Sequence, residues 1–151
     1  MTPTTQPAEP NLLALENQVC FALAVASRSV LALYRPVLEP LGLTHPQYLV
    51  MLALWEQSPR SVKELGLALQ LEPATLSPLL KRLESAGLVR RERSSLDERV
   101  LDITLTDAGR QLREQAEAIP GTIVSELGMS LEELNTLRGT LHAVIAAAAR
   151  S

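Results

Sequence analysis

The segment Leu88–Leu105, LVRRERSSLDERVLDITL, decides the fold that this sequence predicts. Two short runs, 88–93 and 100–105, flank the polar segment SSLDE. Two such runs around a short polar tip favour a β-hairpin. The first run contains four arginine or glutamate side chains after its apolar start, and three of them are arginines, so the predicted hairpin is basic.

Two short helices are predicted directly before the hairpin. The segment 61–64, SVKE, is a capping box, and it opens a helix that ends near Leu69. The segment 73–87, PATLSPLLKRLESAG, predicts a second helix with a proline near its start and a glycine just past its end. Pro78 removes one backbone hydrogen bond, which is tolerable near an N-terminus on an outward face. Two short helices and a basic hairpin make a winged helix–turn–helix, which we expect over about 44–105.

Longer helices are predicted before this lobe. Apolar residues at helical spacing predict a first helix from Leu12 to about Tyr34, which Pro36 and the residues after it break. The segment 44–47, THPQ, is a capping box with a proline in the first turn, and it opens a helix through Trp55. The first helix is apolar on more than one face, so its own domain or another subunit must cover it.

Two more helices are predicted after the hairpin. The segment 106–109, TDAG, caps a helix that runs to about Glu117, with a break at 120–121, Pro-Gly. The segment 130–133, SLEE, is another capping box, and it opens an alanine-rich helix that ends near Ala149.

These elements define the expected fold class and domain organisation. The fold is expected to be mainly α with a small β-hairpin wing, in a single domain over 12–151. Its helices within 12–38 and 106–149 are too apolar to stand alone, so we expect them to form a dimer interface. The residues 1–11, MTPTTQPAEPN, lack the basic and apolar parts of a signal peptide, and their proline and threonine content predicts a disordered tail.

Composition restricts the function classes. The chain has 151 residues, the size of one domain, with 46% hydrophobic and 21% charged residues. No apolar run approaches 18 residues, so the sequence predicts no membrane span. The single cysteine cannot form an internal disulfide, which fits a reducing cytoplasm.

Charge is unevenly distributed along the chain. The formal net charge is −3, yet the segment 60–99 contains eight basic residues against six acids, while the remainder is acidic. A basic middle within an acidic chain is expected of a DNA-binding module, although a solvated charged face would give the same count.

The sequence does not favour an enzyme. His45 and His142 lie far apart, and we find no paired nucleophile and base, no glycine-rich phosphate loop and no metal-ligand cluster. No cofactor and no metal site are therefore expected. A thiol peroxidase that uses Cys20 and a dimerising adaptor without DNA stay as alternatives.

The segment 92–109, ERSSLDERVLDITLTDAG, resembles the wing of the MarR family of bacterial regulators. In that family an Asp-x-Arg pair at the wing tip precedes a strand ending in Leu-Thr, and here the pair is Asp97 and Arg99. The resemblance extends from Leu12 to Ala149. It implies a dimer whose recognition helices enter successive major grooves of a palindromic operator.

The resemblance also implies which side chains contact DNA. The candidates are Thr75, Ser77, Lys81, Arg82, Arg91, Arg93, Asp97 and Arg99. Thr75 and Ser77 are short enough to reach base edges, and Arg82 lies farther along the helix, near phosphates. Arg99 would enter the minor groove, oriented by the carboxylate of Asp97, although this pair would also serve as a turn-stabilising surface ion pair. The other wing arginines supply phosphate affinity, and at least one of them is a candidate for pairing within the protein.

A narrower resemblance concerns redox sensing. The segments 15–30, LENQVCFALAVASRSV, and 35–56, RPVLEPLGLTHPQYLVMLALWE, are similar to the branch of the family that senses organic hydroperoxides, as is 71–91. In that branch a cysteine at the position of Cys20 is the sensor, and Tyr34 matches one of the supporting tyrosines. Two positions depart from the branch, because Ala24 and His45 stand where it has tyrosines.

Geometry constrains how such a sensor could form. On one helix, Cys20 and Tyr34 lie on nearly the same face but about 21 Å apart, so Tyr34 would reach the cysteine of a partner subunit. A mid-helix cysteine lacks the N-terminal dipole, so a protonated His45 is one candidate for supporting its thiolate, and a plain helix-cap role is the other.

The predicted function is a cytoplasmic repressor that releases its operator when an organic hydroperoxide or a related oxidant oxidises Cys20. The oxidised residue would pass to a sulfenic acid, then to a mixed disulfide with a low-molecular-weight thiol, to a Cys20–Cys20 link or to higher oxidation states. The main alternative is a MarR-type repressor that answers a small-molecule ligand, with Cys20 structural.

Overall fold

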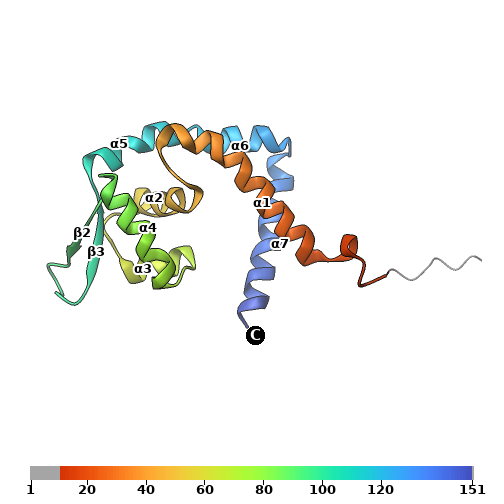
Figure 1. Cartoon of the computed structure of the whole chain (residues 1–151), viewed down its shortest axis with the longest axis horizontal. Helices are drawn as coiled ribbons and strands as arrows, with labels where there is room; N and C mark the ends of the chain where they lie inside the picture. The colour runs from red at the N-terminus through yellow and green to blue at the C-terminus, as the bar shows by residue number, and fades with distance from the viewer. Residues whose placement is uncertain (1–10, 151) are drawn as a thin grey trace, which may run out of the picture.

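The computed structural model describes residues 11–150, and the predicted tail 1–11 lies outside them except for Asn11. Short 3₁₀ helices (η) accompany α-helices and three strands (Figure 1). Their order is η1 Leu15–Asn17, α1 Val19–Leu38, η2 Glu39–Leu41, α2 His45–Glu56, β1 Arg60–Ser61, α3 Val62–Leu69, α4 Pro73–Ser85, β2 Val89–Arg93, β3 Leu101–Leu105, α5 Asp107–Ala116, α6 Ile119–Leu127 and α7 Leu131–Ala149.

The first helix differs from its predicted range at both ends. It begins at Val19, because Gln18 is extended, with φ −87° and ψ 113°, and acts as the N-cap. It continues past Pro36 to Leu38, so the predicted break at that proline was wrong. Proline fixes a helical φ and removes a single N–H donor, which the last turn of a long helix tolerates.

The helices of the winged lobe begin where the capping boxes predicted. Thr44 Oγ1 accepts from the backbone N–H of Gln47, and Gln47 Oε1 accepts from the N–H of Thr44, so this box is complete. Ser61 Oγ accepts from the N–H of Glu64 at 3.0 Å and starts α3. These local contacts confirm the predicted starts of α2 and α3.

The predicted hairpin is present and gains a third strand. The sheet has the order β1-β3-β2, and all of its pairs are antiparallel. Residues Val89 and Leu105 face each other at the base, and Arg93 and Leu101 do so near the tip. Strand β1 was not predicted, because its two residues are too few to show an alternating pattern.

The break between the helices after the wing lies earlier than predicted. Helix α5 ends at Ala116, and α6 begins at Ile119 with Pro120 and Gly121 inside its first turn. The predicted break at these two residues was therefore misplaced, because proline suits the first turn of a helix. The box Ser130–Glu133 is complete and starts α7 as predicted.

A dense core fills the winged lobe. Fully or nearly fully buried apolar side chains come from α2, α3, α4, β2 and β3 and include Met51, Leu65 and Ile103. The four buried residues of α4 recur at helical spacing, namely Leu76, Leu79, Leu80 and Leu83. They fix one face of α4 on the lobe and leave the other face exposed.

A glycine joins three parts of this lobe. The Nε1–H of Trp55 in α2 donates to the carbonyl oxygen of Gly109 at 2.9 Å. A Cβ at Gly109 would collide with the carbonyl oxygen of Leu88, which precedes β2. Thr106 Oγ1 accepts from the Gly109 N–H and donates to the carbonyl oxygen of Gly87. Helix α5 is thus held tightly against both α2 and the base of the wing.

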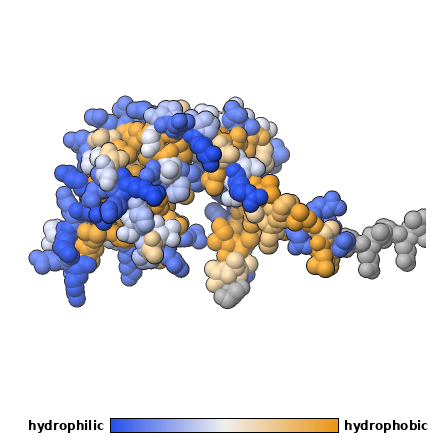
Figure 2. Space-filling model, viewed as in Figure 1, coloured by the Kyte–Doolittle hydropathy of each residue, from blue (hydrophilic) through white to orange (hydrophobic). Residues whose placement is uncertain are grey.

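The terminal helices have little cover. Among the described residues α7 has no buried side chain, and α1 has only Leu38. In Figure 1, α7 and the first turns of α1 lie apart from the winged lobe, whereas the C-terminal end of α1 contacts α2. Figure 2 shows hydrophobic residues over both helices. The segment Val19–Leu41 is also long and apolar enough to cross a membrane by length and composition, which the sequence analysis did not expect. It includes Arg28 and Arg35, and an uncovered subunit interface has the same composition.

Candidate nucleic-acid interface and redox site

The exposed face of α4 carries the predicted base- and phosphate-contacting side chains. Its four candidates are all exposed: Thr75, Ser77, Lys81 and Arg82. Thr75 and Ser77 belong to the first turns of the helix, and the two basic residues lie in its second half. The packing of the leucines on the opposite face gives this polar face a fixed orientation, although contact with DNA remains a prediction.

The predicted Asp97–Arg99 pair is formed at the wing tip. Asp97 Oδ1 accepts from the backbone N–H of Arg99 at 3.0 Å and from its Nε–H at 3.3 Å. The Arg99 side chain is 91% exposed, so one edge of the guanidinium is held while the remainder faces solvent. One carboxylate thus both closes the turn and orients the arginine, and the entry of Arg99 into a minor groove stays a prediction.

Arg91 is the wing arginine that pairs within the protein. Its Nε–H and Nη2–H donate to Glu84 Oε1 at 3.2 and 3.0 Å, and its backbone N–H donates to Glu84 Oε2. These hydrogen bonds hold the pKa of Glu84 below its ordinary value. Arg91 therefore links β2 to the recognition helix α4, a role that the sequence analysis did not assign to it individually.

Arg93 has a different environment. Its Nη1–H donates to the carbonyl oxygen of Glu98 at 2.8 Å across the hairpin, and the residue is exposed. The side chain stays accessible for a phosphate while bracing the wing. Arg90 is exposed too, with Glu92 nearby at 3.8 Å.

Cys20 lies at the start of its helix and not in the middle. It is the second residue of α1 and is exposed. The predicted mid-helix position was wrong, because the helix begins at Val19 and not at Leu12. The first turn has the positive end of the helix dipole, which stabilises a nearby negative charge. The neighbours Val19, Phe21 and Leu23 are exposed apolar side chains on the same helix.

Tyr34 and His45 lie together, at the other end of α1. Their ring centroids are 4.8 Å apart in an edge-to-face arrangement, and Tyr48 lies 5.9 Å from Tyr34 and 6.3 Å from His45. We refer to these three residues as the aromatic cluster. Tyr48 was not among the predicted site residues, although its position three residues after His45 puts both on one side of α2.

Burial sets the ionisation of the aromatic cluster. It lowers the pKa of His45, and it raises the pKa of Tyr34. The pKa of Tyr48 is raised by burial and further by the Tyr34 hydroxyl. Burial therefore disfavours a positive charge on His45 within this chain, and its place at the N-terminus of α2 does so too. The protonated imidazole and the helix-cap role of His45 both stay predictions, since the protonated form would need the negative charge of a partner's Cys20 beside it.

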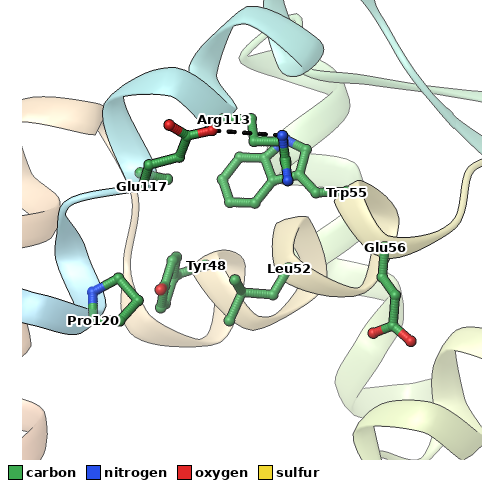
Figure 3. A pocket seen from close by; sticks show the side chains of 8 residues that line it. Tyr48, Leu52, Trp55, Glu56, Arg113, Glu117 and Pro120 are labelled. Atoms are coloured by element: carbon green, nitrogen blue, oxygen red, sulfur yellow. Dashed lines mark ion pairs between the residues drawn. The ribbon is translucent and has the colours of Figure 1, made fainter.

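A cavity of about 370 Å³ opens beside the aromatic cluster, between α2 and the helices after the wing (Figure 3). Tyr48, Leu52 and Trp55 line it from α2. Arg113 and Glu117 line the opposite side, and their charged groups are 3.5 Å apart. The cavity is largely apolar with one ion pair at its edge.

Comparisons with known proteins agree with the winged helix. A family model described as "Transcriptional regulator SarA/Rot" matches residues 32–116. The organic hydroperoxide resistance transcriptional regulator of Bacillus subtilis is 44% identical over 133 residues, which cover 88% of this chain and 90% of that protein.

Solved structures of related proteins are similar along most of the chain. Reduced AbfR bound to DNA is 39% identical, with a TM-score of 0.73 over 88% of this chain and 93% of its own. AbfR is a protein of Staphylococcus epidermidis. The TM-score is also 0.73 for the overoxidised form of AbfR bound to DNA, and it is 0.65 for the disulfide form. CouR from Rhodococcus jostii RHA1, bound to p-coumaroyl-CoA, is 27% identical, with a TM-score of 0.75 over 87% and 94% of the two chains.

These matches span the helix–turn–helix and the wing whose geometry is described above. The family model alone covers more than half of the chain, from the end of α1 to the end of α5. The chain therefore belongs to the SarA/Rot group of MarR-type winged-helix proteins, and it is a DNA-binding transcriptional regulator.

Proposed function

We propose that this regulator is a dimeric repressor that releases a palindromic operator when an organic hydroperoxide oxidises Cys20. The observation that carries the proposal is the exposed thiol in the first turn of α1, on a helix whose apolar side chains lack cover. A thiol in that place is accessible to an oxidant, and its modification changes a surface that a second subunit would cover. The regulator from Bacillus subtilis, named for organic hydroperoxide resistance, supports the choice of oxidant.

The chemistry needs a peroxide and a small thiol. The Cys20 thiolate attacks the terminal oxygen of a hydroperoxide, so that an S–O bond forms, the O–O bond breaks and the alcohol leaves with a proton. The cysteine is thereby oxidised by two electrons to a sulfenic acid. A low-molecular-weight thiol then attacks this sulfur, an S–S bond forms, and the S–O bond breaks with release of water.

The dimer would bring the two ends of α1 together. Cys20 and Tyr34 are 14 residues apart on one continuous helix, which corresponds to about 21 Å. If the first helices of two subunits cross in an antiparallel manner, the aromatic cluster of one chain approaches Cys20 of the other. An adduct on the sulfur would then push against the cluster and alter the spacing of the two recognition helices.

We assign DNA release to the disulfide state and not to overoxidation. Overoxidised AbfR has been solved bound to DNA, and the disulfide form of that protein is less similar to this chain than the reduced form. A sulfinic or sulfonic group is small, whereas a mixed disulfide adds the whole of a second molecule at the interface. This chain has one cysteine, so its disulfide must be with a small thiol or with Cys20 of its partner.

A gel shift tests the proposal. The probe is the intergenic DNA upstream of the gene for this regulator, and the reagents are cumene hydroperoxide, hydrogen peroxide and hypochlorite, each with and without a small thiol. We expect cumene hydroperoxide plus thiol to release the DNA from the natural protein and to leave the complex of Cys20→Ser intact. Release from Cys20→Ser would refute the redox proposal.

A second candidate function is ligand-responsive repression. The cavity beside the aromatic cluster favours it, since its lining is largely apolar and includes Arg113, which an anionic aromatic compound would have to take over from Glu117 in the presence of Glu56 (Figure 3). CouR, which has been solved with p-coumaroyl-CoA, has a similar fold. In this case an aromatic acid would release DNA from Cys20→Ser as well as from the natural protein, and Arg113→Ala would abolish the response. Either mode of regulation acts on DNA, so we place the protein in the cytoplasm.

A further inference from the structure

The wing tip holds a leucine that the described residues leave uncovered. Leu96 is 96% exposed, the highest value among the exposed large apolar side chains of the described residues. Most of the others lie on α1 and α7, at the far end of the molecule from the wing (Figure 1). The uncovered surface of the terminal helices therefore does not account for Leu96.

The backbone around Leu96 is braced, so its exposure is built into the tip. Its own N–H donates to Ser94 Oγ at 3.2 Å. The N–H of Val100 donates to the carbonyl oxygen of Asp97, and the N–H of Ser94 donates to that of Val100. These bonds close the turn on both sides of the leucine, whose side chain is exposed.

Charged groups around the tip favour a nucleic acid as the occupant. The guanidinium groups of Arg99 and Arg93 are tied to the turn by Asp97 and by the carbonyl oxygen of Glu98, and both side chains stay exposed. The tip also contains the carboxylate of Glu98, which must face away from a phosphate. Minor-groove binding proteins combine arginines with inserted apolar side chains, leucine among them, that contact the bases in the groove.

We propose that Leu96 inserts into the minor groove of operator DNA, where it packs against deoxyribose walls and base edges beside Arg99. This inference rests on the proposed operator binding. Leu96 contributes affinity through apolar contact, whereas Arg99 contributes it through charge. The two side chains therefore differ in how their removal changes the salt dependence of binding.

The experiment compares three variants on a duplex selected from a random pool by the natural protein. Operator affinity is measured by fluorescence anisotropy at several salt concentrations. Leu96→Ala is expected to weaken binding about 10- to 30-fold with the salt slope unchanged. Arg99→Ala is expected to weaken binding and also to reduce the slope by about 1 per chain. Leu67→Ala is the matched control, because Leu67 is an exposed leucine on α3, and it should bind like the natural protein.

A change in the DNA identifies the groove. Diaminopurine in place of adenine adds an amino group to the minor groove without changing the major-groove edge. When this base is placed where the wing protects the duplex, it should lower the operator affinity of the natural protein more than that of the Leu96→Ala variant. Equal losses of affinity for the two proteins on the diaminopurine duplex would overturn the proposal. So would a Leu96→Ala variant that binds the unmodified duplex as tightly as the natural protein, or one whose oligomeric state in sedimentation has changed. If the natural protein selects no duplex at all, operator binding itself fails, which is a separate result.

Discussion

The winged lobe and the terminal helices bury their apolar side chains in different ways. In the lobe, residues such as Leu65 and Ile103 are completely buried by their own chain. On α7, Leu137, Val144 and Ile145 are each 45% exposed. The lobe therefore buries these side chains within the chain, whereas the apolar face of α7 stays half-exposed, and we propose that a second copy covers it. Stability and oligomeric state should consequently respond to different substitutions.

The largest effect is expected from a truncation in the core of the lobe. Leu65→Ala removes a fully buried side chain and should lower the free energy of unfolding by about 2–5 kcal/mol. Leu137→Ala, on the half-exposed face of α7, should lower it by a smaller amount. Urea denaturation at one fixed, high protein concentration measures both values. Equal losses would show that the two regions form one core.

The second effect concerns association. Val144→Glu introduces a charge on the apolar face of α7, and an unpaired charge in an interface is costly, so the dimer Kd should rise about 100-fold or more. Sedimentation velocity over a dilution series measures the change. Asn135→Glu, which helical spacing puts on the opposite side of α7, is the control and should keep the natural Kd. A dimer that tolerates Val144→Glu would contradict the assigned interface.

The third prediction tests the contact between the recognition helix and the wing. The pKa of Glu84 is lowered by hydrogen bonds from Arg91, so the folded state binds fewer protons than the unfolded one near the ordinary value of 4.5. The resulting stabilisation is present above pH 4.5 and is lost as pH falls through the lowered pKa. Glu84→Gln should reduce this acid dependence, measured by urea denaturation between pH 7 and pH 3. An unchanged profile would mean that the pair does not stabilise the folded state.

The smallest effect is expected in the aromatic cluster, where the two regions meet. Burial lowers the pKa of His45, so its contribution to stability is complete above the ordinary value of 6.5 and is lost as pH falls through the lowered pKa. His45→Gln should flatten the thermal stability profile between pH 7 and pH 5. His142→Gln, which changes an exposed histidine on α7, should leave the natural profile in place. If the thermal stability of His45→Gln depended on pH as steeply as that of the natural protein, the acid sensitivity would belong to other groups.

Local signals predicted most of the fold. The boxes at 44–47 and 130–133 and the hairpin at 88–105 depend on contacts between residues near in sequence, so the pattern contained them. The predicted start of α1 at Leu12 was wrong. Apolar residues keep helical spacing from Leu12 onward, but the extended backbone of Gln18 makes the helix begin at Val19. That error placed Cys20 in the middle of a helix.

The site was predictable only where its residues are neighbours in the chain. The Asp97–Arg99 pair spans two residues and is formed as the motif predicts. The hydrogen bonds between Arg91 and Glu84 cross a turn, and the aromatic cluster joins α1 to α2, so neither arrangement follows from spacing alone. Tertiary contacts decide that Arg91 is the wing arginine paired within the protein, and they also set the direction in which the pKa of His45 shifts.

Gly109 has a consequence for how this sequence can vary over evolutionary time. Its carbonyl oxygen accepts from Trp55, its N–H donates to Thr106, and its missing side chain leaves room for the backbone at Leu88. Each contact alone would permit a replacement with a shift of one partner, but here three partners would have to shift at once. A saturation library selected for operator binding should therefore return glycine at this codon, while the neighbouring exposed codons Ala108 and Arg110 accept many residues.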